Sequence, residues 1–68
     1  MIGGQLTLAE MRVYDWALTS KTAKQIAAAM NLSVSTVKLH LHNIYRKKGV
    51  DGRLMLIVNH LPEQKAGQ

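Results

Sequence analysis

One segment constrains the fold most: residues 33–50, SVSTVKLHLHNIYRKKGV, have the pattern of a single capped amphipathic helix. Ser33 is a preferred residue at a helix amino terminus, and Gly49 can adopt the left-handed conformation that ends a helix. At roughly 100° per residue, one stripe is apolar and would face a core: Val37, Leu41 and Ile44. The opposite stripe, with Lys38 to one side, is long, cationic and free of acidic residues: Ser35, Leu39, His42 and Arg46. This outward face is suited to a groove lined by phosphates and base-edge acceptors.

Helix caps elsewhere in the chain predict three further helices and no sheet. Two pairs match the capping box, in which side chains and backbone N–H groups bond reciprocally: Thr7 with Glu10, and Thr22 with Gln25. The first helix is expected to end near Thr19 or Ser20. Four of its residues are expected to point toward the core: Met11, Val13, Tyr14 and Leu18. The second helix is short, and Asn31 is expected to form the turn after it.

The fourth helix is expected to follow a cap at Asp51 and to stop before Pro62, because proline lacks the backbone N–H that a helix interior requires. A connection of about three or four residues joins the second and third helices, which is typical of a helix-turn-helix. The sequence therefore predicts an all-α domain of four helices over residues 6–61, with the third as recognition helix. Flexible tails are expected at residues 1–5 and 62–68.

Composition narrows the class of partner. Nine Lys and Arg residues against four Asp and Glu give a formal charge of +5, and the isoelectric point is about 10.0. This balance favours a polyanionic partner. The 68 residues contain no Cys, which excludes disulfides and Cys-based zinc sites and suits a cytoplasmic location. The apolar runs are far shorter than the roughly 20 residues that span a bilayer, so no membrane association is expected.

The last helix carries the second unusual feature, a run of five consecutive apolar residues from Leu54 to Val58. Such a run covers more than half of the helix circumference, so one flank is expected to face something other than its own core. A second subunit is the expected cover, through five residues: Leu54, Met55, Ile57, Val58 and Leu61. The alternative is that the other three helices bury both flanks.

A series of residue types at fixed spacing runs through almost the whole domain: Leu6-Thr7, Glu10, Ile26-Ala27, Ser33, Thr36-Val37-Lys38, His40, Asn43-Ile44, Lys47, Gly49-Val50 and Arg53. This series resembles the LuxR-type, or GerE-like, helix-turn-helix domain of bacterial transcription regulators. The resemblance implies a four-helix fold, a third helix in the major groove and a fourth helix that usually pairs two subunits on a two-fold operator.

By position, the resemblance implies base contacts from Lys38, Leu39 and His42. It also implies phosphate contacts from four residues: Lys24, Thr36, Asn43 and Lys47. Ser35 and Arg46 lie on the outward stripe, and we expect them to contact phosphate as well. The expected partners are double-stranded DNA, a second copy of the chain and RNA polymerase, with no cofactor, metal or small-molecule substrate. Ala9 and Arg12 depart from the family's Arg and Glu, so an ion pair within the domain is expected to be absent or rearranged.

Two other classes of function compete with that of a DNA-binding regulator. An enzyme or metal protein is not predicted, because His40 and His42 diverge by roughly 200° on a helix and cannot chelate together. A protein-interaction module would dock on another regulator or on RNA polymerase without binding DNA, and would explain the apolar last helix equally well. Salt-dependent binding to duplex DNA separates the regulator from the module. The sequence fits both a self-sufficient regulator and the output domain of a longer protein.

Overall fold

Four helices make up the part of the chain that the computed structural model describes, residues 5–61. They are α1 (Leu8–Ala17), α2 (Ala23–Met30), α3 (Val34–Lys48) and α4 (Arg53–His60). No strand occurs in this range, which confirms the predicted all-α fold. Apart from Gln5, the expected tails at 1–5 and 62–68 lie outside the described residues.

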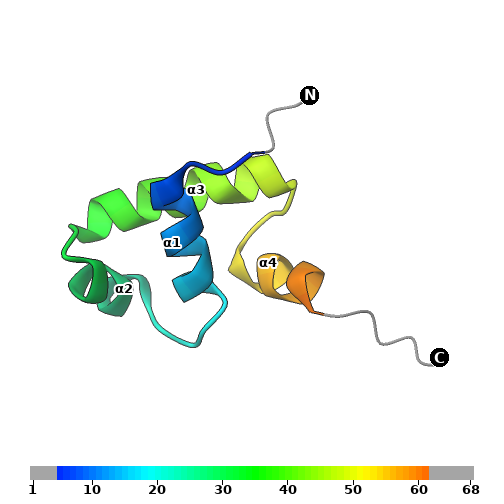
Figure 1. Ribbon diagram of the computed structural model, residues 1–68. Coiled ribbons are helices and arrows are strands. Elements are labelled where there is room, and N and C mark those ends of the chain that lie inside the picture. The colour runs from blue at the N-terminus through cyan, green and yellow to red at the C-terminus, as the bar shows by residue number, and fades with distance from the viewer. Residues whose placement is uncertain (1–4, 62–68) are drawn as a thin grey trace.

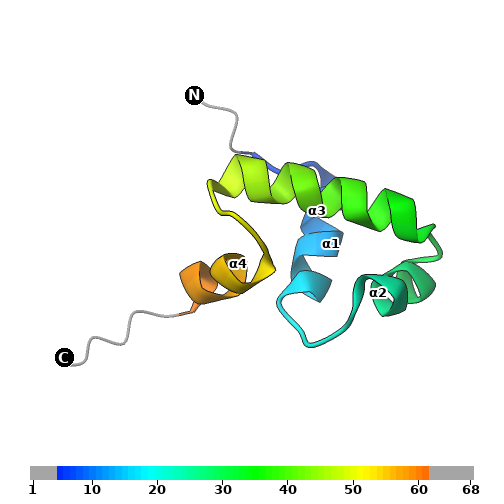
Figure 2. The same ribbon diagram turned by 180° about the vertical axis from the view of Figure 1, so that it is seen from behind.

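The long helix α3 runs along one side of the domain, and the shorter helices lie beneath it (Figure 1). Viewed from either side, α1 lies between α2 and α4 (Figures 1 and 2). α2 lies at the amino-terminal end of α3, and the segment after α3 turns back to place α4 on the other side of α1. None of the helices in residues 5–61 is long and apolar enough to cross a membrane.

The core is formed by eight buried apolar side chains drawn from all four helices: Val13, Ala17, Ile26, Ala27, Val37, Leu41, Ile44 and Leu56. α3 contributes three of them, and they are the three predicted for its inward stripe. α4 contributes Leu56 alone. α3 is therefore anchored by apolar packing over its first ten or so residues, whereas α4 is attached by much less apolar surface.

The predicted caps and turns are confirmed for the first three helices. In α1, the Thr7 hydroxyl accepts a hydrogen bond from the backbone N–H of Glu10 at 3.1 Å, and the Glu10 carboxylate accepts one from Thr7 N–H at 2.9 Å. Ser33 Oγ accepts a bond from Thr36 N–H at 3.1 Å. Asn31 and Gly49 both adopt the left-handed conformation, at φ 59° and 71°. These turns set the path of the chain into and out of α3.

Three local predictions were wrong. Asp51 does not cap α4, because the helix begins at Arg53 with Gly52 as its cap residue and without a side-chain bond. Met11 is 47% exposed, since Glu10, Val13 and Ala17 form the buried face of α1 and Met11 points away from it. α1 ends at Ala17 rather than near Thr19 or Ser20. The Arg53 guanidinium binds the carbonyl groups where this helix ends.

Candidate nucleic-acid interface

The outward face of α3 is exposed and free of acidic residues, as the sequence predicted. Lys38, Leu39 and His42 are all exposed, and so are Ser35 and Arg46. Leu39 is a large apolar side chain that is 57% exposed in the middle of this polar surface. The structure thus places the three residues expected to contact bases together on one accessible helix face.

The residues expected to contact phosphate differ in their exposure to solvent. Lys24 is exposed in the first turn of α2, while Thr36 and Asn43 are half-buried along one flank of α3. The hydroxyl groups of Thr36 and Ser33 lie 2.8 Å apart, so the Thr36 side chain already has a partner at the helix amino terminus. Neutral hydroxyl and amide groups at such positions can donate to phosphate oxygens.

Lys47 has a partner within the domain. Its Nζ lies 2.6 Å from Oε1 of Glu10, and the two side chains are 28% and 6% exposed. Hydrogen bonds from Lys47 and from the backbone of Thr7 hold the pKa of the Glu10 carboxyl below its ordinary value. This pair joins the start of α1 to the last turn of α3, and so an ion pair within the domain is present although Ala9 and Arg12 depart from the family pattern.

Two further polar contacts attach α4. Arg53 donates from Nε to the carbonyl oxygen of Ala17 at 2.8 Å and from Nη2 to that of Thr19 at 2.7 Å. Near the other end of α4, His60 Nδ1 lies 3.0 Å from the Tyr14 hydroxyl, with the two rings in an edge-to-face arrangement. Lys48 at the end of α3 lies over the same Tyr14 ring, 5.2 Å from its centre. Tyr14 therefore contacts both α3 and α4.

Sequence reasoning missed the partners in these contacts. Glu10 was predicted as a helix cap, and Arg53 was noted only as part of the family pattern. The pairs are separated by more than 30 residues in the chain, and no local pattern indicates them. Only the crossing of α1 with α3 and α4 brings them together.

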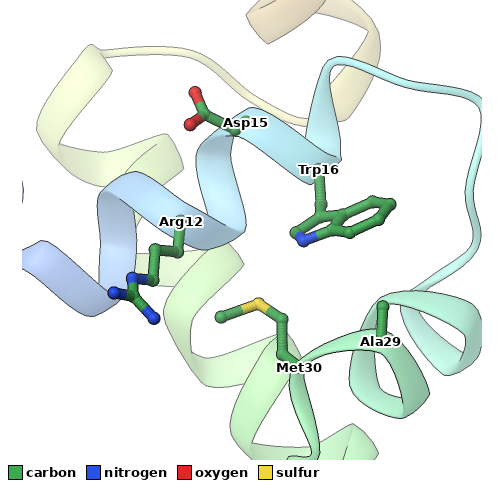
Figure 3. A pocket seen from close by; sticks show the side chains of 5 residues that line it. All are labelled: Arg12, Asp15, Trp16, Ala29 and Met30. Atoms are coloured by element: carbon green, nitrogen blue, oxygen red, sulfur yellow. The ribbon is translucent and has the colours of Figure 1, made fainter.

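An open groove lies between α1 and α2, on surface that the sequence did not single out. Figure 3 shows the side chains of Trp16 and Met30 facing one another across it, with Arg12 and Asp15 on the α1 side. Trp16 is half-buried and packs against the core. Within residues 5–61, no three His, Asp or Glu side chains gather as metal ligands would.

A short helix, a left-handed turn at Asn31 and a longer cationic helix together define a helix-turn-helix domain of the DNA-binding class. The chain matches the family model "Bacterial regulatory proteins, luxR family" over residues 4–59. The chain belongs to this family of transcription regulators.

Similarity to individual regulators agrees with this. The chain is 38% identical over 53 residues to the spore germination protein GerE of Bacillus subtilis (strain 168), an alignment that covers 78% of the chain and 72% of GerE. It is 49% identical over 41 residues to the transcriptional activator protein EsaR of Pantoea stewartii subsp. stewartii. It is 39% identical over the same length to the transcriptional activator protein ExpR of Dickeya dadantii (strain 3937). These two alignments cover 60% of the chain but only 16% of each activator.

Proposed function

We propose that the domain binds duplex DNA sequence-specifically, with α3 in the major groove, and regulates transcription in the bacterial cytoplasm as a homodimer. The observation that carries the proposal is the exposed, acid-free face of α3. An α-helix fits the major groove, and a helix surface that carries cations without carboxylates is attracted to the phosphates on both sides of that groove.

Within this proposal, three exposed side chains of α3 contact base edges. Lys38 donates to guanine O6 or N7, and His42 donates or accepts according to its tautomer. Leu39 packs on a thymine methyl group, which accounts for a large apolar side chain at 57% exposure on this face. Phosphate contacts come from a surrounding set: Lys24, Ser35, Thr36, Asn43 and Arg46.

The homodimer is proposed to form through α4. Leu54 is 73% exposed, and Met55, Val58 and Leu61 are also exposed, whereas Leu56 is buried in the core. Leu54, Val58 and Leu61 follow helical spacing of four and three, so they form one continuous apolar stripe. An apolar stripe on one side of a short helix is covered most simply by the same stripe of a second copy, in an isologous interface.

The second candidate function is docking on a protein, and RNA polymerase is the expected partner. The exposed apolar stripe of α4 favours it, and the groove lined by Trp16, Met30 and the charged Arg12 and Asp15 offers a second surface. Neither surface includes the predicted DNA contacts on α3. A protein-interaction module without DNA binding would use these surfaces alone.

Selection of random duplex DNA against the purified domain tests the proposal. Bound pools would be sequenced and then titrated at several salt concentrations. An enriched inverted repeat with half-sites about one helical turn apart supports a dimeric, sequence-specific regulator. Binding without enrichment contradicts sequence specificity, and no binding at low salt contradicts DNA binding and favours the protein-interaction module.

A further inference from the structure

Glu10 has two hydrogen-bond partners that belong to different parts of the fold. Its carboxylate accepts bonds from the backbone N–H of Thr7 at 2.9 Å and from the ammonium group of Lys47 at 2.6 Å. Among residues 5–61, it is the one charged residue that is buried. Burial of a carboxylate is unfavourable unless the charge is paired, and the neutral backbone N–H of Thr7 supplies no charge. The buried Glu10 carboxylate therefore depends on Lys47 as its counter-ion.

The cap itself does not require a charge at this position. α2 begins with the same reciprocal arrangement, in which Gln25 replaces the acid: Thr22 N–H donates to Gln25 Oε1 at 2.8 Å, and Gln25 N–H donates to Thr22 Oγ1 at 3.1 Å. Gln25 is exposed and has an uncharged side chain. The comparison within one molecule separates the two roles of Glu10, because an amide oxygen suffices to cap a helix and only the ion pair needs the carboxylate.

The ion pair lies where the apolar packing of α3 ends. The last buried side chain of this helix is Ile44, and the final turn contains three basic residues: Arg46, Lys47 and Lys48. Of these, Lys47 is bound to Glu10 and Lys48 lies over the Tyr14 ring, so two contacts with α1 hold this turn. Arg46 is exposed on the outward face.

Lys47 also leaves α3 on a different side from Lys38. The two lysines are nine positions apart, a rotation of roughly 900°, so Lys47 lies on the flank that carries Thr36 and Asn43, away from the base-contacting face. A phosphate that captured Lys47 would leave the buried Glu10 carboxylate without its cation. The loss of a partner in a buried pair is more costly than a surface ion pair is favourable.

We propose, resting on the DNA-binding function above, that Glu10 and Lys47 are a positioning pair. They hold the last turn of α3 against the start of α1 and so fix where Arg46, the phosphate-contacting cation of that turn, lies relative to the base-contacting residues, because phosphate contacts set the register and orientation of the helix on DNA. In this role Lys47 does not neutralise a phosphate. Arg46 is the cation of this turn that contacts phosphate.

The test compares four variants with the unmodified domain: Glu10→Gln, Lys47→Gln, the double variant, and Arg46→Gln as a matched control at the neighbouring position. Binding to the selected operator and to an unrelated duplex is titrated over a range of salt concentrations. Arg46→Gln should flatten the slope of log K against log salt by about 0.9, equally on both duplexes. Lys47→Gln and the double variant should keep the original slope but lose several-fold preference for the operator.

The double variant guards against loss of folding, since it removes both charges and leaves no unpaired buried ion. Urea unfolding of each variant should give a non-additive result, with the double variant more stable than the sum of the single changes predicts. If Lys47→Gln flattens the slope as Arg46→Gln does and keeps operator preference, Lys47 is a phosphate contact and the proposal is wrong.

Amide hydrogen exchange tests the positioning role without DNA. In Glu10→Gln, protection should fall at residues 46–48 and stay unchanged at residues 37–41; unchanged protection throughout contradicts the proposal. If the unmodified domain fails to bind any duplex, the proposed function is wrong, and hydrogen exchange alone then decides whether the pair positions this turn.

Discussion

The Arg53 guanidinium binds the carboxyl-terminal turn of α1, with Nε 2.8 Å from the carbonyl oxygen of Ala17. The same group donates to the carbonyl oxygens of Trp16 at 3.4 Å and Thr19 at 2.7 Å. The last carbonyl groups of a helix have no hydrogen-bond donor within it and carry partial negative charge. A cationic side chain placed there donates hydrogen bonds to these carbonyl groups and offsets their charge. One side chain therefore ends α1 and fixes the first residue of α4.

Arg53→Lys should lower the free energy of unfolding by about 1–2 kcal/mol, because lysine keeps the charge but cannot bridge three carbonyl groups from one planar head. Urea denaturation measures this, and Arg12→Lys is the matched control, since Arg12 is exposed on α1. Equal stability of the two variants would show that the guanidinium geometry contributes nothing.

Lys38→Ala and His42→Ala should each weaken binding to the selected operator by about 1–3 kcal/mol, because contacts to base edges confer specificity. Affinity for an unrelated duplex should change much less. Arg46→Ala is the comparison, and it should weaken both duplexes alike. The assignment of Lys38 and His42 is wrong if random DNA loses as much affinity as the operator.

Val58→Glu should abolish cooperative binding to two half-sites while the monomer remains folded, because a carboxylate in the middle of the α4 stripe cannot be buried against a second copy. Val58 is 47% exposed, whereas Ile57 is half-buried and Ile57→Glu would also disturb the fold. Asn59→Glu adds the same charge at an exposed polar position of α4. Analytical ultracentrifugation and DNA titration should distinguish the two, and cooperative binding by Val58→Glu would exclude this interface.

Gly49→Ala should lower the free energy of unfolding by about 1 kcal/mol, since a Cβ is unfavourable in the left-handed conformation. Gly49 has φ 71°, and an added Cβ would meet no atom within 4 Å, so the backbone conformation is the only penalty. Gly52→Ala is the control, because Gly52 has φ −178°, which is extended backbone, and equally open surroundings. Similar losses in both variants would contradict this explanation.

Stability should fall in acid partly through Glu10. Its pKa is lowered in the folded state from the ordinary 4.5 by the hydrogen bonds from Lys47 and Thr7. The stabilisation is therefore fully present above about pH 5 and is lost as pH falls through the lowered value. Urea midpoints measured between pH 6 and pH 3 should decline less for Glu10→Gln than for the unmodified domain. If the urea midpoints of the two proteins fall equally with pH, Glu10 does not contribute to the loss of stability in acid.

Local patterns predicted most of the fold. Capping boxes at Thr7 and Thr22 and the left-handed turns at Asn31 and Gly49 depend on residues no more than four positions apart, which sequence displays directly. The spacing of Val37, Leu41 and Ile44 likewise gave the buried face of α3, and with it the exposed face that carries Lys38, Leu39 and His42.

Tertiary structure decided which charged side chains are free and which are occupied. The sequence predicted phosphate contacts from both Arg46 and Lys47. In the structure α1 crosses beneath α3, so Lys47 is bound to Glu10 and Lys48 lies over the Tyr14 ring. The tertiary structure also placed the cap residue of α4 at Gly52 rather than Asp51, and the first residue of the helix, Arg53, reaches the end of α1. Caps and amphipathic faces follow from neighbours in the chain, whereas the partner of a long side chain depends on which helices cross, and that is settled only when the core packs.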